Sequence, residues 1–366
     1  MAIKGLFINN IKAQDSIYES GLMVFNSLKL SSLYQLDYVE INVNQRTIPL
    51  GYDFYFFNYH PFTMAWVDTS QLKKINGLVL TMVLEVSPGN PFVLCPSTHF
   101  HGYCVLDPTI VHKNKRVFTF PRPLETINNL QPYVEKEIPV IGTFGFATRG
   151  KGFQHVVEAV NKEFEKAIVK INIPFGDFVP DSRTYSQFLG NLCKETAKKG
   201  IEVIVTHDYM SKEQLINWCS QNTLNCFLYD RNMPGLAATT DQAIISGRPI
   251  AISNNDTFRH ILAYLPPYPN NSLKQSVEAS TTAIKQMQKD WSQENFALKF
   301  EEMLQTLLSI HPKENQHQEL FEIPVFKNTL PHKIKNIYKK YKGIFTIRKL
   351  KQLRILKRFF KYEEPI

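Results

Sequence analysis

A glycine-rich turn between a predicted strand and a predicted helix, residues 138–160 (IPVIGTFGFATRGKGFQHVVEAV), constrains the fold of this chain most. A short apolar run of the kind that forms a buried parallel strand comes first, and a helical pattern with valines on one side comes last. Between them lie glycines 142, 145, 150 and 152, with Arg149 and Lys151 among them. Glycines let a backbone approach an oxyanion, and a helix N-terminus and a lysine supply positive charge. The stretch predicts a phosphate-binding turn, or else a tight turn with a solvent-facing lysine.

The length and composition indicate a globular protein with two domains. A chain of 366 residues is too long for one ordinary core, and 43% hydrophobic and 20% charged residues are typical of soluble proteins. No apolar run reaches the about 18 residues of a membrane-spanning helix, and the start is too soon polar for a signal peptide. Five cysteines without CxxC spacing indicate neither a zinc site nor a disulfide framework. We therefore expect a cytoplasmic protein.

The net charge of +9 is concentrated in the last residues of the chain. From His332 onward there are 12 Lys and Arg and 2 acids, against 30 Lys and Arg and 31 acids before it. The body is nearly neutral, which argues against a nucleic-acid-binding surface, and no nucleic-acid partner is expected.

Strand and helix patterns alternate along most of the chain. Strands are predicted at residues 4–9, 36–43, 52–59, 77–86, 93–95, 103–106, 116–120, 139–145, 169–173, 202–206, 226–229 and 249–253. A loop followed by a helix is predicted at residues 15–28, and helices are predicted at residues 151–164, 186–199, 211–222 and 238–246, with Ser211 as the N-cap of the helix at 211–222. The layout predicts an α/β protein with mainly parallel sheets, in which ligands bind at the carboxyl ends of the strands.

Three blocks of the second half resemble the donor-binding half of a GT-B-fold glycosyltransferase, most of all glycosyltransferase family 4. They are residues 138–160, with the strand, glycine turn and Lys-Gly; residues 207–230; and residues 234–252, with a glycine-led helix and a Gly-x-Pro turn. The first half is similar to the acceptor domain only in outline, through a loop at Glu19-Ser20-Gly21 and strands that end near His60 and Glu85.

The resemblance implies two Rossmann-like, doubly wound domains followed by a basic helical tail. The expected boundaries are 1–125 for the acceptor-side domain, 126–137 for a linker, 138–312 for the nucleotide-sugar-binding domain and 313–366 for the tail. It also implies a hexosyltransferase that uses a nucleotide-diphosphate sugar as co-substrate, without a metal or other cofactor, on a glycan or lipid-linked glycan. The implied donor-binding residues are Gly21, Gly145, Arg149, Lys151, His207, Tyr209, Gly235, Thr239, Thr240 and Asp241.

Lys151 is the first candidate to neutralise the charge that develops on the departing diphosphate, and Arg149 is the second. Thr239 and Thr240 could donate to a phosphate or could cap the following helix. The sequence departs from the family at three positions. Phe146 stands where an arginine is usual, and Pro234 and Gln242 stand where the family has paired glutamates.

A general base for the acceptor hydroxyl would come from the first domain. His60 and Glu85 follow predicted strands and are the candidates; Asp68 and His99 are weaker ones. An enzyme that retains the sugar's configuration would need no such base, because the leaving phosphate can take the proton. Arg259 and His260 could face the donor or could form a salt bridge at a helix start.

The C-terminal tail has the pattern of a basic amphipathic helix. Leu350, Leu353, Leu356 and Phe360 fall on one side, with Arg354, Lys357, Arg358 and Lys361 mostly on another. Such a helix binds an anionic membrane surface, which residues 332–361 would do at the inner face of a membrane. The alternatives are a helix packed on the body of the protein and a helix that binds the phosphate backbone of a nucleic acid.

Two other functions fit the same features. A nucleotide-sugar 2-epimerase of the same fold would act without an acceptor and would need acids in its cleft. A non-catalytic protein with a degenerate donor site would bind a nucleotide sugar in a glycan assembly complex, which the departures at Phe146, Pro234 and Gln242 favour.

Overall fold

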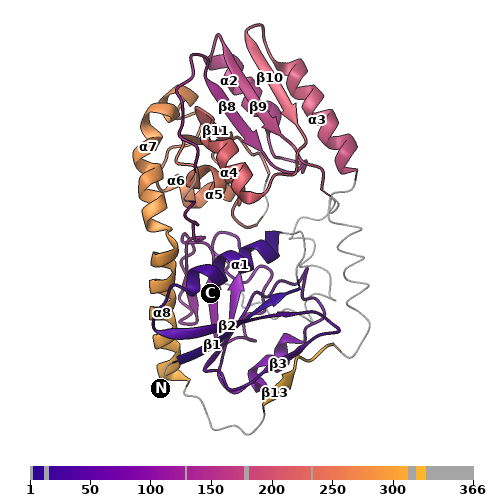
Figure 1. The fold of residues 1–366 in the computed structure, drawn as a ribbon, viewed down its shortest axis with the longest axis vertical. Coiled ribbons are helices and arrows are strands. Elements are labelled where there is room, and N and C mark those ends of the chain that lie inside the picture. Colours follow the sequence, from indigo (N-terminus) through magenta and orange to yellow (C-terminus); the bar gives the residue numbers. More distant parts are fainter. Residues whose placement is uncertain are drawn as a thin grey trace. The chain divides into compact units, whose positions relative to one another are not determined.

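The computed structural model describes residues 3–11, 16–127, 130–176, 181–231, 234–311 and 319–326. It is an α/β structure that divides into two compact units, each with its own parallel sheet (Figure 1). The first unit contains residues 1–123 and 293–366 and the second contains residues 124–292. The predicted fold class, two Rossmann-like α/β units, is confirmed.

The first unit is built on a six-stranded parallel sheet in the order β2-β1-β4-β5-β6-β7. Its strands are β1 (Ile3–Asn10), β2 (Tyr34–Ile41), β4 (Phe54–Phe57), β5 (Leu78–Val83), β6 (Gly102–Val105) and β7 (Val117–Thr119). Every residue of β4 and β5 is buried, because apolar side chains alternate between two cores, one on each face of the sheet.

One core of the first unit is closed by helices and the other by irregular segments. Helices α1 (Ser16–Leu28) and α8 (Gln293–Ile310, orange in Figure 1) pack against each other, and Phe300 of α8 contacts aromatic rings of the sheet. The opposite core includes Leu72 of the 3₁₀ helix η1 (Thr69–Lys74) and the fully buried Ile323.

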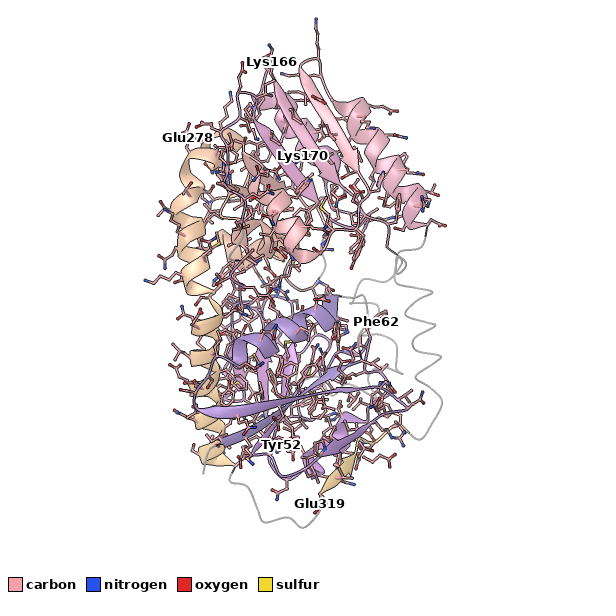
Figure 2. All side chains as sticks on the ribbon, viewed as in Figure 1. Tyr52, Phe62, Lys166, Lys170, Glu278 and Glu319 are labelled. Carbon is pink, nitrogen blue, oxygen red and sulfur yellow. The ribbon has the colours of Figure 1, made fainter. Side chains whose placement is uncertain are left out.

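Residues 319–326 form a strap on the first unit. Strand β13 (Leu320–Glu322) pairs antiparallel with β3 (Thr47–Pro49), and the backbone of Glu319, labelled in Figure 2, accepts a hydrogen bond from Leu50 N. An ion pair joins Arg46 to Glu322. The strap therefore belongs to the first unit, although the sequence had placed it at the start of the tail.

The second unit is built on a five-stranded parallel sheet in the order β10-β9-β8-β11-β12. Its strands are β8 (Val140–Phe144), β9 (Ala167–Asn172), β10 (Ile201–Thr206), β11 (Leu224–Phe227) and β12 (Ile250–Ile252). Its helices are α2 (Phe153–Glu163), α3 (Ser182–Thr196), α4 (Lys212–Ser220), α5 (Thr239–Ile245), α6 (Arg259–Leu262) and α7 (Leu273–Asp290), with the 3₁₀ helix η2 (Asp256–Phe258). One core contains residues of α2 and α3 and the other contains residues of α4, α5 and α7, which is the doubly wound arrangement.

The two units end at different residues from the predicted domains. Residues 293–311, expected in the second domain, belong to the first unit because the apolar side of α8 packs on the first sheet. The predicted linker at 126–137 falls within the second unit, where Gln131 N donates to Asn217 Oδ1 and the Tyr133 hydroxyl bonds to Thr223. The tail from residue 327 onward lies outside the described residues.

Local predictions were mostly confirmed, with two exceptions. The N-cap predicted at Ser211 is present and is part of a capping box, since its side chain accepts from Gln214 N and the Gln214 side chain accepts from Ser211 N. Residues 93–95 form bends rather than a strand. Val93 and Cys95 are buried, so the apolar pattern here indicates burial and not a strand. Glu19, Ser20 and Gly21 lie in α1 and not in a loop. Over the described ranges, no helix is long and apolar enough to cross a membrane.

Candidate functional site

The glycine-rich turn follows β8 and packs against the end of β11. Gly145, Gly150 and Gly152 have φ angles of 138°, 77° and 65°, which other residues rarely adopt. A Cβ added to Gly150 would lie 2.5 Å from Arg231 Cβ, and one added to Gly152 would lie 1.8 Å from Leu228 O. Glycine is therefore required here both for the backbone angle and for the close approach of the neighbouring strand.

Replacing Gly152 with alanine should destabilise the protein by about 3 kcal/mol, since left-handed strain and a clash with a backbone oxygen add together. Gly89→Ala is the matched control, because Gly89 has a φ of 73° and nothing within 4 Å of the added Cβ. The control should lose only about 1 kcal/mol, as expected for the strain alone. Urea unfolding measures both, and equal losses would contradict the proposed clash.

Lys151 lies in this turn and is buried, with only 8% of the residue exposed. Its Nζ donates a hydrogen bond of 2.8 Å to the Tyr229 hydroxyl and lies 4.5 Å from the centroid of the same ring. Burial, with the nearby charge of Arg231, holds the pKa of the Lys151 amine well below its ordinary value. The alternative of a solvent-facing lysine is wrong.

A chain of polar groups leads from Lys151 to α5. The Tyr229 hydroxyl, whose pKa burial raises to about 12, forms a 2.8 Å hydrogen bond with Thr239 Oγ1. A Cβ on Gly145 would lie 3.2 Å from Lys151 Nζ and 3.5 Å from Thr239 Cγ2. The structure thus brings Gly145, Lys151 and Thr239 together, as the sequence predicted, at the carboxyl ends of β8 and β11.

The start of α5 holds the other predicted residues of this region. Gly235, with a φ of 90°, precedes the helix, and Asp241 is buried in its first turn. The N-cap is Ala238, and no side chain caps the helix; the Thr240 hydroxyl donates instead to Ala237 O at 2.7 Å. Neither Thr239 nor Thr240 is therefore an N-cap.

Tyr209, one of the predicted donor-binding residues, borders a groove of about 490 Å³. Asp208, Tyr209 and Met210 line it, together with Trp218 of α4 and Lys170 of β9, which is labelled in Figure 2. Tyr209 is 66% exposed. His207 lies outside this lining; its Nδ1 is 2.8 Å from Ile173 O, and its ring stacks on Phe175 at 4.8 Å.

Of three other predicted positions, Arg259 and His260 make local contacts and Arg149 is exposed. Arg149 is exposed on the turn, Arg259 donates to Asp256 O at the start of α6, and His260 is buried and stacks on Trp291. The hydrogen bond of Arg259 joins it to a backbone carbonyl at the helix start. Arg149 was predicted to bind the donor together with Lys151, but its side chain faces solvent.

In the first unit, His60 and Glu85 come together after β4 and β5. His60 Nε2 lies 3.9 Å from Glu85 Oε1, and His60 Nδ1 accepts a hydrogen bond of 3.1 Å from Phe62 N. The neutral ring therefore carries its proton on Nε2, toward Glu85. His60 is 5% exposed, whereas 39% of the Glu85 side chain is exposed, so the carboxylate is the more accessible member.

The remaining candidates of the first unit have structural surroundings. Asp68 caps η1 by accepting from Ser70 N, and His99 Nδ1 lies 2.7 Å from Thr69 Oγ1. Gly21 is buried where a Cβ would lie 2.4 Å from Asn58 Nδ2, so it allows α1 to approach the strand ends. Among the described residues, no group of three or more His, Cys, Asp or Glu side chains could hold a metal ion.

Sequence reasoning missed Tyr229 and Arg231. Tyr229 accepts a hydrogen bond from Lys151, and the Arg231 guanidinium lies beside the Tyr229 ring. Both follow β11, a predicted strand, and the carboxyl end of that strand was the available signal. Their relation to Lys151, 78 residues away for Tyr229, is a tertiary contact that no local pattern specifies.

No family model matches this chain, and no curated protein matches it. Solved structures do. The structure of Anabaena Alr3699/HepE with UDP and glucose is similar over 83% of this chain and 100% of its own, with a TM-score of 0.54 at 10% identity. The structure of trehalose-6-phosphate synthase OtsA is similar over 83% of this chain and 98% of its own, with a TM-score of 0.56 at 9% identity. That of a glycosyltransferase from Rickettsia africae is similar over 84% of this chain and 97% of its own, with a TM-score of 0.53 at 12% identity. Identity this low shows the fold alone, and the fold of this chain is the GT-B fold of these proteins.

Proposed function

We propose that the protein is a glycosyltransferase that takes its sugar from a nucleotide-diphosphate donor held at Lys151. The observation that carries the proposal is the buried amine of Lys151 in the glycine turn, hydrogen-bonded to a hydroxyl. A lysine buried without a carboxylate costs free energy, and an anion bound beside it would offset that cost. A diphosphate at the carboxyl ends of β8 and β11 supplies such an anion.

The site residues have complementary roles in this chemistry. Glycosyl transfer releases a nucleoside diphosphate, so positive charge at Lys151 stabilises the transition state as negative charge develops on the phosphates. The Tyr229 and Thr239 hydroxyls hold the amine in place, and Thr239 can donate to a phosphate oxygen. This arrangement needs no metal ion, and we propose a metal-independent hexosyl transfer.

Glu85 is the proposed acceptor-side base. Its carboxylate is accessible and lies 3.9 Å from His60 Nε2, and we propose that the ring helps to orient the carboxylate toward an acceptor hydroxyl. His60 is then a positioning residue and not the base. We propose a glycan or a lipid-linked glycan as the acceptor.

Ligand-induced thermal stabilisation tests the donor site. The panel contains UDP, GDP, ADP, CMP and their common sugars, with UDP first because HepE was crystallised with UDP and with UDP-glucose. One nucleotide should raise the melting temperature of the wild type and fail to raise that of Lys151→Ala. Stabilisation by none of them would contradict the proposed function.

The tail should bring the protein to an anionic membrane. Removing residues 332–366 leaves the strap at 319–326 in place, so the first unit keeps Ile323 in its core. Each lysine or arginine near an anionic surface contributes about 1 kcal/mol, so the full chain should bind vesicles containing phosphatidylserine and the truncated chain should not. Neutral phosphatidylcholine vesicles are the control. Equal binding after truncation would refute the role of the tail, which lies outside the described residues.

A second candidate, a non-catalytic nucleotide-sugar-binding protein, is favoured by one observation. Pro234 and Gln242 replace the acidic pair of the family, and Gln242 Oε1 is buried with no hydrogen-bond partner in the described part of the chain. Tight nucleotide binding without release of nucleotide from a nucleotide sugar, with or without acceptors, would establish this function. Conversion of the sugar without an acceptor would instead indicate an epimerase.

A further inference from the structure

We infer that Arg231 is the second cation of the donor site and binds the diphosphate together with Lys151. The inference rests on the proposed function. It assigns a second positive charge of the site to a residue in the segment after β11, whereas the glycine turn supplies only Lys151. The expected ligand is the diphosphate group of a nucleotide or nucleotide sugar.

Arg231 and Lys151 share one aromatic ring. The Arg231 guanidinium carbon lies 5.3 Å from the centroid of Tyr229, and Lys151 Nζ lies 4.5 Å from the same centroid. Burial first, and then the charge of Arg231, lowers the pKa of the Lys151 amine. Two like charges beside one ring repel each other, and a multivalent anion between them removes the repulsion.

The Arg231 guanidinium is available for a ligand. Its Nε is buried and has no hydrogen-bond partner, and no hydrogen bond or ion pair between described residues uses its other nitrogens. The neighbouring carboxylate, Asp230, lies 3.3 Å from His155 Nε2 and is engaged there instead. A guanidinium with a planar set of donors matches phosphate oxygens in a two-point contact.

The backbone around Arg231 is fixed against the glycine turn. Asn255 Nδ2 donates to Arg231 O at 2.9 Å, and Asp230 N donates to Gly150 O at 3.1 Å. The absence of a side chain at Gly150 lets the Arg231 backbone approach, since a Cβ there would lie 2.8 Å from Arg231 Cα. Hydrogen bonds and close backbone packing therefore hold the turn that carries Lys151 against the segment after β11 that carries Arg231.

Neither Phe146 nor Arg149, the two other candidate positions in the turn, supplies a second positive charge beside Lys151. Phe146 is uncharged and its ring lies 6.5 Å from that of Tyr209, and Arg149 is exposed. Arg149→Gln is therefore a matched control for Arg231→Gln, because it removes the same group from the outer side of the same turn.

The test measures UDP affinity of the full chain by calorimetry, or GDP or ADP affinity if the panel above selects that nucleotide. Arg231→Gln should raise the Kd by about tenfold or more, Arg231→Lys by less, and Arg149→Gln by less than about twofold. A second readout is the pH at which affinity declines on the alkaline side. It should move to higher pH in Arg231→Gln, because Lys151 loses a neighbouring positive charge, and should stay in place in Arg231→Lys.

The outcomes separate the two proposals. Normal affinity and an unmoved alkaline limit in Arg231→Gln, with binding lost in Lys151→Met, would overturn the role of Arg231 and leave the proposed function standing. Failure of the wild type to bind any nucleoside diphosphate would remove both. Should Arg231→Gln not fold, Arg231→Lys decides, since an affinity equal to that of the wild type at every pH would contradict a two-point contact by arginine.

Discussion

Replacing Lys151 with methionine should lower nucleotide affinity and turnover by about 30- to 1000-fold, which corresponds to about 2–4 kcal/mol. The free energy of unfolding should stay the same or rise, because methionine fills a similar volume without the cost of burying an amine. Calorimetric titration with UDP, nucleotide release from the nucleotide sugar and urea unfolding measure the three quantities. A loss of nucleotide affinity without a loss of stability would show that Lys151 acts on the ligand and not on the fold.

Lys162→Met is the control for this experiment. Lys162 is exposed on α2, the helix that follows the glycine turn, and should change neither affinity nor stability appreciably. If Lys151→Met instead lost stability and kept its nucleotide affinity, Lys151 would be a structural residue that supports Tyr229. Tyr229→Phe distinguishes these roles further, since it removes the hydroxyl that joins Lys151 to Thr239.

Nucleotide binding should take up a proton when the pH lies above the pKa of Lys151 in the free protein. Burial and Arg231 hold that pKa low, whereas a bound diphosphate favours the charged amine and raises it. Affinity should then be constant below the lower pKa and fall by up to about tenfold per pH unit between the lower and the raised pKa.

Calorimetry in two buffers with different enthalpies of ionisation counts these protons. The wild type should take up a fraction of a proton that approaches about one as the pH rises through the window between the two pKa values. His155 near the turn contributes to the signal at lower pH, so His155→Gln serves as the background. No proton uptake at any pH would show that Lys151 is already charged in the free protein.

Much of the fold could be predicted from sequence because many of its parts have a local signal. Buried strands such as β5 are continuous apolar runs, and α4 begins with a capping box formed by Ser211 and Gln214. The extent of each unit could not be predicted this way. Helix α8 has an apolar side that would suit either sheet, and only its packing against α1 and Phe54 assigns it to the first unit.

The glycine turn of the candidate site could be predicted from the sequence, but the burial and charge environment of Lys151 could not. Glycines with a lysine between them mark the turn, but whether Lys151 faces solvent or Tyr229 depends on how the turn packs on β11. The approach of His60 and Glu85 could be expected from two neighbouring strands that end together. Which of the two side chains is accessible depends on how the residues around them pack, and no spacing of residues encodes it.

The second unit is inserted, as a continuous segment, between two parts of the first. Leu124 N donates to Trp291 O at 2.7 Å, so the ends of this segment meet within the second unit. During synthesis, residues 124–292 leave the ribosome before α8 and Ile323 exist, and the core of the first unit needs both. The second unit can therefore complete its core first, which reverses the usual N-terminal-first order of domain folding.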